Sequence, residues 1–173
     1  MPQNKQTKPE TPTKRTRRVQ ERAEITRAKL IKAGTVMFSE RGFDGVSVRD
    51  LENAAGVKRN LLAYHFDDKD TLWKRVTDDI YGLMKTEFDQ RLLISQEMSG
   101  RNSLAFVVRF YVYFHARHPE LSRLVAQEAT QHSWRTQYMI EHHIRPATGA
   151  MEKLVKETQG LNRDAFIHWY YIM

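Results

Sequence analysis

The chain contains no cysteine among its 173 residues, and this absence excludes several kinds of site. Without thiols there is no disulfide framework, no thiol nucleophile and no cysteine-rich zinc site, and the composition fits a reducing interior. Long apolar runs are missing as well, because no stretch approaches the ~18 residues that a membrane helix needs. The polar N-terminus lacks the apolar segment of a secretory signal. We therefore expect a soluble, cytoplasmic protein without a membrane partner.

Positive charge is in excess, but only in one part of the sequence. Residues 1–66 carry 14 Lys and Arg against 7 Asp and Glu, a net charge of +7, whereas residues 67–173 carry 14 against 14 and are neutral. A basic segment beside a neutral body is typical of proteins that bind a polyanion. The basic stretch has no matching apolar stripe, so nucleic acid is favoured over an acidic membrane surface.

Strand-like alternation is also lacking, and apolar residues recur at helical spacing through most of the chain. A first helix is predicted from Glu24, ending before Gly42, because a glycine suits the left-handed C-cap position. Hydrophobic residues make up 40% of the chain, which is enough for a core. These features predict an all-α fold. Later helices are predicted from Lys69, over residues 103–117, after Pro119, over residues 134–158 with a kink at Pro146, and from Asn162.

Between Ser47 and His65 the pattern predicts two short helices separated by a glycine. Ser47 is a good N-cap, with Asp50 three residues later as a capping-box partner. Gly56 should end this helix, and the next is predicted from Lys58 to His65. Two helices that cross steeply need small residues at the joint, a residue free to adopt positive φ, and apolar anchors. The sequence supplies them in order with Ala55, Gly56, Val57, Leu62 and Phe66.

If the apolar anchors point inward, a helical wheel directs the remaining side chains outward. Lys and Arg suit phosphates or guanine edges, Asn can read adenine, an exposed Leu can touch a thymine methyl, and Tyr or His can hold phosphate. Each residue taken alone fits an ordinary surface or packing role about as well. The predicted reading surface consists of Lys58, Arg59, Asn60, Leu61, Tyr64 and His65. A flexible basic arm would reach the DNA backbone or the minor groove through Lys14, Arg15, Arg17 and Arg18.

The segment from Leu30 to Leu72 resembles the N-terminal domain of TetR-family transcriptional regulators. The resemblance implies a flexible arm over residues 1–22, a helix-turn-helix DNA-binding domain over 23–68, and a helical effector-binding and dimerisation domain over 69–173. It also implies a non-enzymatic repressor that binds a palindromic operator in double-stranded DNA as a homodimer and is released by a small-molecule effector. Residues expected to contact the DNA beside the reading surface are Ser47, Val48, Arg49 and Lys69. The matching features are Phe38, Gly42, Phe43, Ser47, Val48, Leu51, Ala55, Gly56, Val57, Leu62, Phe66, Lys69 and Leu72.

Three positions depart from the family pattern. Glu52 stands where the family most often has a small alanine at the helix crossing, so its side chain is expected to swing outward or to loosen the joint. Ala63 occupies a position where many members carry a tyrosine, whose phosphate contact Tyr64 could take over. Asn60 replaces a frequent glycine.

The body of the chain contains aromatic and apolar residues with a few polar tips, as small-molecule pockets usually do. The same residues could equally form an ordinary helical core. Residues 116–129 resemble the start of ligand-binding domains in the family. The candidate effector-binding residues are Phe106, Phe110, Tyr113, Phe114, Trp134, Tyr138, Met139 and His142.

Seven histidines raise the alternative of a metal enzyme. Adjacent residues on a helix diverge by about 100°, so His142 and His143 cannot easily share one ion. We therefore expect no metal site, no cofactor and no catalysis. A second alternative is a basic helical module that binds RNA or an anionic surface.

The last residues, FIHWYYIM, are strongly apolar. Family members of this kind usually finish with two long helices that pair with those of a second subunit. The sequence stops within the first of them, so we expect either a truncated chain or dimerisation through a reduced surface.

Overall fold

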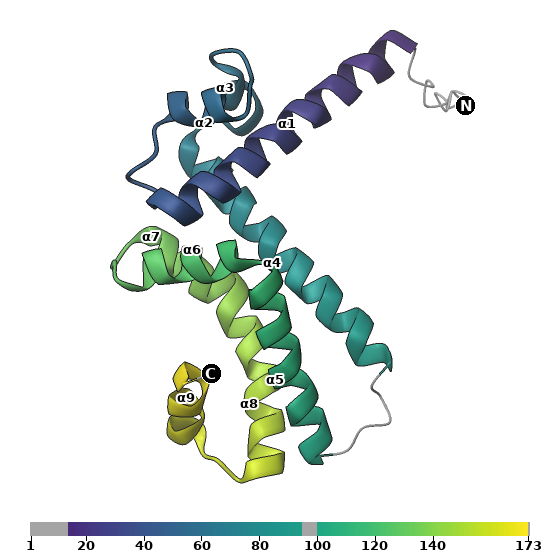
Figure 1. Ribbon diagram of the computed structural model, residues 1–173, viewed down its shortest axis with the longest axis vertical. Helices are drawn as coiled ribbons and strands as arrows, with labels where there is room; N and C mark the ends of the chain where they lie inside the picture. Colours follow the sequence, from purple (N-terminus) through teal and green to yellow (C-terminus); the bar gives the residue numbers. More distant parts are fainter. Residues whose placement is uncertain (1–13, 95–99, 173) are drawn as a thin grey trace, which may run out of the picture.

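The computed structural model describes residues 14–94 and 100–172, and every regular element in these ranges is helical (Figure 1). The predicted all-α fold is thus confirmed. Helix α1 packs against α4 and α6, the short helices α2 and α3 lie against α1 at one end, and α5 packs along α8 at the other. The elements are α1 (Lys14–Arg41), α2 (Val48–Ala54), α3 (Leu61–Phe66), α4 (Lys69–Ile94), α5 (Gly100–Arg117), α6 (Pro119–Ala129), α7 (Trp134–Met139), the π-helical segment η1 (Ile140–Ile144), α8 (Arg145–Gln159) and α9 (Arg163–Ile172).

Helix α1 begins at Lys14, well before the predicted start at Glu24. The predicted flexible arm is therefore wrong for residues 14–22, which are helical, and the rest of it lies outside the described part of the chain. The sequence between Pro12 and Gly34 contains neither proline nor glycine. It is rich in Arg, Lys and Ala, which favour helix, so the helix continues back toward the proline.

The N-terminal half of α1 projects from the rest of the molecule (Figure 1). Leu30 is the first of its described side chains to be fully buried, and the described side chains before it are exposed or half-buried. Further along, Gly34 allows α1 to approach α4 closely, because a Cβ atom there would lie 2.9 Å from a methyl group of Val76.

Two apolar clusters hold the helices together. The larger one begins in α1, includes α2 and α3, and continues through α4 into α5, α6 and α7, so it joins the N-terminal helices to the body. Its fully enclosed side chains include Leu30, Phe38, Val46, Leu51, Leu62, Leu72, Trp73, Val76, Phe114, Leu121 and Leu124. The smaller cluster joins α5, α8 and α9 through Leu104, Val107, Met151, Val155 and Phe166. No helix in residues 14–94 and 100–172 has the length and apolar character needed to cross a membrane.

The helix predicted over residues 134–158 is divided into α7, η1 and α8. The interruption predicted at Pro146 takes the form of the π-helical turn Ile140–Ile144, and Pro146 itself lies in the first turn of α8. Proline fits there because its missing N–H is not needed in a first turn. π-Helical turns are rare insertions that change which side chains face a neighbouring helix.

Candidate nucleic-acid interface

A reciprocal cap fixes the N-terminus of α2. The backbone N–H of Asp50 donates to the Ser47 hydroxyl at 3.1 Å, and the backbone N–H of Ser47 donates to the Asp50 carboxylate at 3.1 Å. Hydrogen bonds from Ser47, first from its side chain and then from its backbone, lower the pKa of Asp50. The predicted N-cap and capping box are confirmed. Val48 and Arg49 lie exposed in the first turn of the helix.

The turn between α2 and α3 is built around Gly56. Its φ of +62° lies in the left-handed region that glycine adopts at little cost, and α2 ends before it at Ala54. The N–H of Val57 then donates to the carbonyl of Glu52 at 3.1 Å. The predicted helix stop at Gly56 is confirmed.

Helix α3 begins at Leu61, later than the predicted start at Lys58. Lys58, Arg59 and Asn60 lie in the turn before it, so a helical wheel does not describe their directions. The reason is the backbone of Asn60, whose φ of 65° is left-handed and cannot belong to a right-handed helix. Asparagine is among the few residues with a side chain that adopt this region readily. All three side chains are exposed.

The six residues of the predicted reading surface differ in exposure. Tyr64 is 78% exposed, and its ring meets that of His65 edge-on with 4.9 Å between the centroids. His65 is half-buried; burial lowers its pKa, and the positive charge of Arg27 acts in the same direction. Leu61 is half-buried as well. The fully exposed part, called the reading surface from here on, consists of Lys58, Arg59, Asn60 and Tyr64.

Glu52 points inward, contrary to prediction. It is only 4% exposed, and its Oε1 atom accepts a hydrogen bond from the backbone N–H of Leu62 at 3.1 Å. The side chain neither swings outward nor loosens the joint, because it ties the end of α2 to the start of α3. The prediction considered the size of a glutamate at a helix crossing and not its capacity to accept a hydrogen bond there.

Lys69 is predicted from the sequence to contact DNA, but its ammonium group is engaged inside the protein. Nζ donates to the carbonyl oxygens of Phe43 at 3.1 Å and Val46 at 3.0 Å, and it lies 3.9 Å from the centroid of the Phe43 ring. The side chain is half-buried. These contacts hold the loop between α1 and α2 against the start of α4, so we reassign Lys69 to a structural role.

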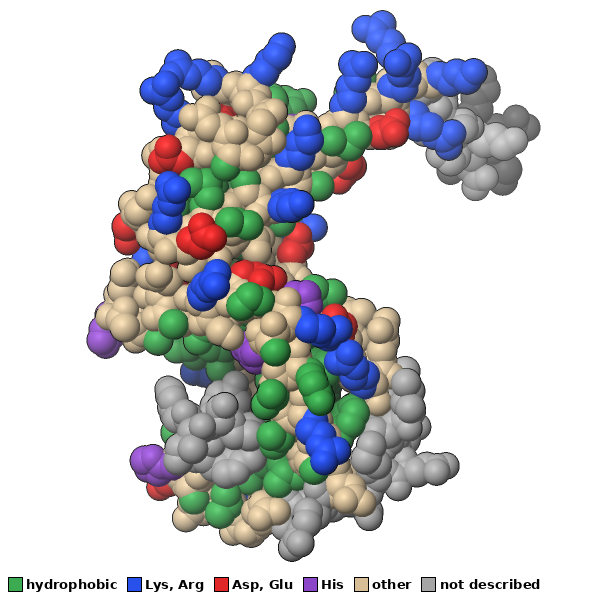
Figure 2. Space-filling model, in the orientation of Figure 1, with side chains coloured by type: hydrophobic (Ala, Val, Ile, Leu, Met, Phe, Trp, Pro, Cys, Tyr) green, Lys and Arg blue, Asp and Glu red, His purple; other side chains and the backbone are tan. Residues whose placement is uncertain are grey.

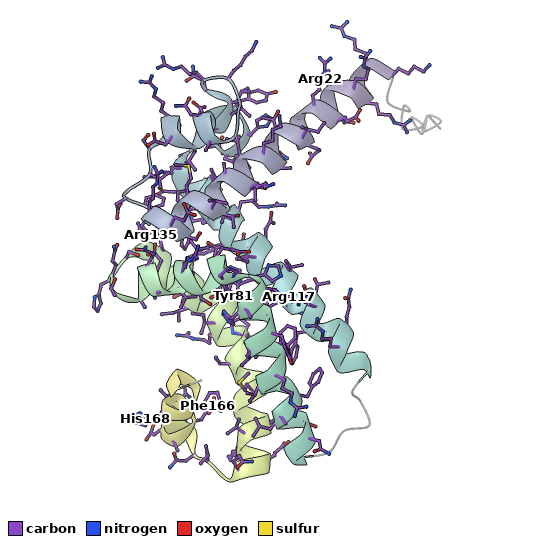
Figure 3. All side chains as sticks on the ribbon, in the orientation of Figure 1. Arg22, Tyr81, Arg117, Arg135, Phe166 and His168 are labelled. Carbon is purple, nitrogen blue, oxygen red and sulfur yellow. The ribbon has the colours of Figure 1, made fainter. Side chains whose placement is uncertain are left out.

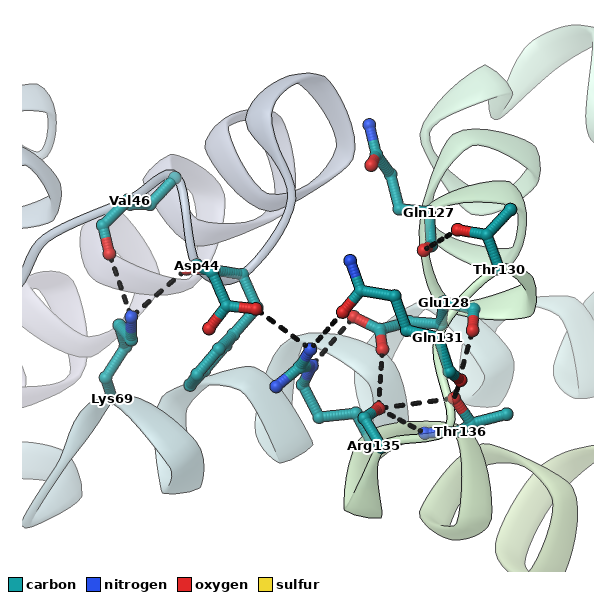
Figure 4. Close-up of polar contacts among 11 residues, drawn as sticks. Asp44, Val46, Lys69, Gln127, Glu128, Thr130, Gln131, Arg135 and Thr136 are labelled. Carbon is teal, nitrogen blue, oxygen red and sulfur yellow. Dashed lines mark hydrogen bonds and ion pairs between the residues drawn. The ribbon is translucent and has the colours of Figure 1, made fainter.

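Arg135 holds the same loop from α7 (Figures 3 and 4). Its guanidinium lies 4.4 Å from the centroid of the Phe43 ring, and Nη2 approaches the carboxylate of Asp44 at 3.4 Å. Nε donates to the buried carboxylate of Glu128 in α6 at 2.8 Å, and Nη2 also donates to Gln131 at 3.1 Å. We call this set the Phe43 clamp; it comprises Phe43, Lys69, Glu128 and Arg135.

The predicted basic residues of the arm lie on the projecting half of α1. Lys14, Arg15, Arg17 and Arg18 are exposed there, and Arg22 follows on the same free half of the helix (Figure 3). Figure 2 shows Lys and Arg side chains gathered on this projection and on the end of the molecule formed by α2 and α3. Within the described residues 14–66, the excess of Lys and Arg is therefore carried by surface side chains of the projection and of the helix-turn-helix.

The candidate effector-binding residues are distributed over several environments. Phe110, Phe114 and Met139 are buried in the larger cluster, whereas Phe106 packs against the smaller one. Tyr113 is 66% exposed. Four of these five residues therefore fit ordinary packing better than a common pocket, and the fifth, Tyr113, faces solvent.

The other three candidates, Trp134, Tyr138 and His142, come together beside α4. Trp134 meets Trp73 edge-on with 5.5 Å between centroids, and Tyr138 meets His142 in the same way at 4.3 Å. The Tyr138 hydroxyl donates to Asp78 at 2.9 Å. Burial, aided by that hydrogen bond and the charge of Asp78, raises the pKa of Tyr138 to about 12. This is the part of the predicted set that the structure brings together.

The adjacent His142 and His143 diverge, as the sequence predicts. His143 donates from Nε2 to Asp78 at 2.9 Å and stacks on the ring of Tyr81 with 4.5 Å between centroids, while His142 contacts Tyr138. Burial lowers the pKa of His143, although Asp78 opposes this shift. Within the residues that the structure describes, no three His, Asp or Glu side chains are grouped so as to hold a metal ion.

Two residues that shape the interface are not identified by sequence reasoning. Glu52 lies next to Leu51 at the crossing of the two short helices, and both side chains are buried. A charged residue at a buried crossing is a signal that a hydrogen-bond partner lies within its reach. Arg135 is missed because its contacts with the loop between α1 and α2, to Phe43 and Asp44, join residues about 90 positions apart in the chain. Its partners meet only in the folded protein.

Comparisons with known proteins identify the same domain. The family model described as "Bacterial regulatory proteins, tetR family" matches residues 30–76. The chain is 31% identical over 110 residues to the HTH-type transcriptional repressor NicS of Pseudomonas putida, a match that covers 62% of this chain and 50% of the relative. It is 29% identical over 114 residues to the HTH-type transcriptional repressor KstR2 of Rhodococcus jostii, covering 59% and 53%. The chain thus spans about half the length of the curated relatives it matches.

A solved structure extends the likeness to the body. The crystal structure of a HlyIIR mutant, in which a linker replaces residues 169–186, superposes with a TM-score of 0.65 at 22% identity. The superposition covers 86% of this chain and 82% of that one, so the two share a fold. Together with the helix-turn-helix, these likenesses lead to one conclusion: residues 30–76 of the chain match the DNA-binding domain of the TetR family of bacterial regulatory proteins.

Proposed function

We propose that this chain is a sequence-specific DNA-binding transcriptional regulator, acting as a repressor in the cytoplasm. The observation that carries the proposal is the reading surface. Lys58, Arg59, Asn60 and Tyr64 are exposed together on a joint that is anchored by buried side chains of α2 and α3, namely Leu51, Glu52, Leu62 and Phe66. Surface side chains held on a rigid scaffold, in a region of excess positive charge, suit the major groove of DNA.

Recognition is divided between base edges and phosphates. Arg59 and Asn60 would read bases, because guanidinium and amide groups form paired hydrogen bonds with guanine and adenine edges. Ser47, Val48 and Arg49 at the N-terminus of α2 would lie along the backbone, where N–H groups and cations hold phosphates. Leu61 and His65 stay predictions of this kind, at the half-buried edge of the surface. The basic residues of the projecting half of α1 would extend these contacts along the duplex.

The assembly proposed is a homodimer on a palindromic operator. Two copies of α3, called the reading helix, would enter successive major grooves together with the turn before them, with centres about 34–36 Å apart. A small molecule bound in the body would shift α4 and the Phe43 clamp, and through them the separation of the two helices. The clamp supports this route because Phe43 belongs to the DNA-binding side, whereas Lys69 begins α4 and Glu128 and Arg135 belong to the body. The proposal assigns no catalysis to the chain.

Substitutions on the reading surface test the assignment. On a duplex that the wild-type protein prefers, Arg59→Ala and Asn60→Gly should each weaken discrimination by about 1–3 kcal/mol at one base pair. Glycine is the better replacement at position 60, because it keeps the left-handed φ while removing the amide. The exposed Arg75, on the body side in α4, gives a matched Arg→Ala control. Unchanged discrimination in both variants would refute the reading surface.

Salt dependence separates phosphate contacts from base contacts. Replacing Lys14, Arg15, Arg17 and Arg18 together with glutamine should reduce the slope of log affinity against log salt by up to about 0.9 for each phosphate that these side chains neutralise. Stability should stay the same because these side chains are exposed. The base preference should also be unchanged. A slope equal to that of the wild type would show that the projecting half of α1 does not contact DNA.

A further inference from the structure

The first turn of α3 has an unusual arrangement of hydrogen bonds. The first N–H groups of a helix have no partner within it, and an Asn at the N-cap commonly satisfies one through its side chain. Asn60 occupies the N-cap of α3, yet among the described residues its side chain makes no such bond. The N–H of Leu62, in the same first turn, is bonded instead to Oε1 of Glu52 at 3.1 Å.

Glu52 reaches this N–H from the interior of the joint. Its side chain is buried and comes from α2, while its own carbonyl accepts the N–H of Val57 in the turn. Both the backbone and the side chain of Glu52 therefore span the connection between α2 and α3. A carboxylate at a helix N-terminus is favoured by the partial positive charge there, and a charged acceptor makes the hydrogen bond stronger.

An internal cap changes what Asn60 can do. With the Leu62 N–H already satisfied, the amide of Asn60 is not required by the helix, and it is exposed between Arg59 and the start of α3. An amide has two donor hydrogens and an acceptor oxygen, the combination that pairs with the N6 and N7 atoms of adenine. The left-handed backbone of Asn60 keeps this side chain outside the helix.

We propose that Glu52 caps the reading helix in place of Asn60 and thereby frees the Asn60 amide to read a base. Glu52 is then a positioning residue for DNA recognition, although it lies inside the protein. Base reading by Asn60 rests on the proposed function, whereas the cap itself is a property of the free protein. Without an acceptor at position 52, Asn60 is the residue placed to cap α3, by moving its backbone from the left-handed region to the extended region of a side-chain N-cap, and its amide would then be withdrawn from the DNA.

Amide hydrogen exchange in the free protein tests the cap. Glu52→Ala should speed exchange of the Leu62 N–H about tenfold or more relative to wild type, because the hydrogen bond is removed. Glu52→Gln keeps an acceptor oxygen at the same reach and should restore most of the protection. Val76→Ala, a core truncation in α4, serves as a control for general destabilisation. If Leu62 exchanges equally fast in wild type and Glu52→Ala, there is no cap and the proposal fails.

Base discrimination on the DNA preferred by wild type tests the release of Asn60. Glu52→Ala should lose preference about tenfold at the base pair that Asn60→Gly also affects, and the double variant should lose no more than Asn60→Gly alone. Glu52→Gln and Val76→Ala should retain the preference. Independent, additive effects, or a Glu52→Gln variant that behaves like Glu52→Ala, would overturn the positioning role. If wild type selects no DNA, the proposed function fails, and the exchange experiment still decides the cap.

Discussion

Replacing Arg135 with methionine should lower the free energy of unfolding by about 3–5 kcal/mol, although arginine is a charged residue. The side chains of Arg135 and Glu128 are only 6% and 3% exposed, and they meet at 2.8 Å. Removing one partner of a buried pair leaves the other charge in a poorly solvated place, which costs about 3–5 kcal/mol. Removing the guanidinium from the face of the Phe43 ring adds about 1 kcal/mol or less. Asp44 adds little, because its side chain is 74% exposed.

Urea denaturation followed by circular dichroism measures the free energy of unfolding for this comparison. The control is Arg75→Met, because Arg75 and Asp79 form an ion pair on the surface of α4 at 2.8 Å. Exposed pairs contribute about 0–1 kcal/mol, so this variant should stay close to wild type. The double variant Glu128→Met with Arg135→Met should recover much of the stability, since neither charge is then buried alone. An Arg135→Met variant as stable as the Arg75 control would refute the reasoning, as would a double variant no better than the single one.

Further predictions concern Lys69 and His143. Lys69→Met removes hydrogen bonds to two carbonyls and should lower the free energy of unfolding by about 1.5–3 kcal/mol. It should leave the slope of log affinity for DNA against log salt unchanged. Lys58→Met should leave the stability unchanged and reduce the steepness of that slope by about 1. A reduced slope for Lys69→Met would restore it as a phosphate contact. Burial lowers the pKa of His143 in the folded protein, so the unfolded chain binds this proton more readily. The stability that neutral His143 contributes is therefore present above its ordinary value of 6.5 and is lost as pH falls below it. Unfolding free energies measured between about pH 7.5 and pH 5 should decline less steeply for His143→Asn than for wild type, and equal slopes would contradict the assignment.

Local signals in the sequence predict much of the helix-turn-helix. Ser47 with Asp50, the glycines at 42 and 56, and Pro119 act through their own backbone or through residues three or four positions away. Gly42 has a φ of 70°, and its N–H donates to the carbonyl of Phe38 at 3.0 Å, as expected of a helix end. Features that depend on such short distances can be predicted because no tertiary contact is needed to form them.

The predictions from sequence are wrong where a distant partner or an unusual backbone conformation determines the local structure. The predicted start of α3 is wrong because the left-handed φ of Asn60 removes Lys58, Arg59 and Asn60 itself from the helix, and an asparagine in the sequence does not by itself predict that conformation. Glu52 is misjudged because its partner, Leu62, lies across the joint. Lys69 carries the positive charge that a phosphate contact needs, but its ammonium group donates to carbonyls of the loop between α1 and α2. The clamp residue Arg135 meets the Phe43 ring, which lies far away in the sequence.

The body is harder to interpret than the N-terminal helices, because aromatic residues serve cores and pockets alike. Phe110 and Phe114 are core residues, whereas Trp134, Tyr138 and His142 meet beside α4 through polar and aromatic contacts. Sequence spacing cannot separate these groups, since both recur at four-residue helical spacing.

Selection of bound duplexes from a random DNA pool by the wild-type protein tests the central claim most directly. The account predicts enrichment of a two-fold symmetric consensus, with half-sites centred about one helical turn apart. It also predicts that the reading surface determines the consensus, so that the pool selected by Asn60→Gly loses one specified base in each half-site. Recovery of unrelated sequences, or binding to RNA or anionic vesicles as tight as to any duplex, would contradict the account.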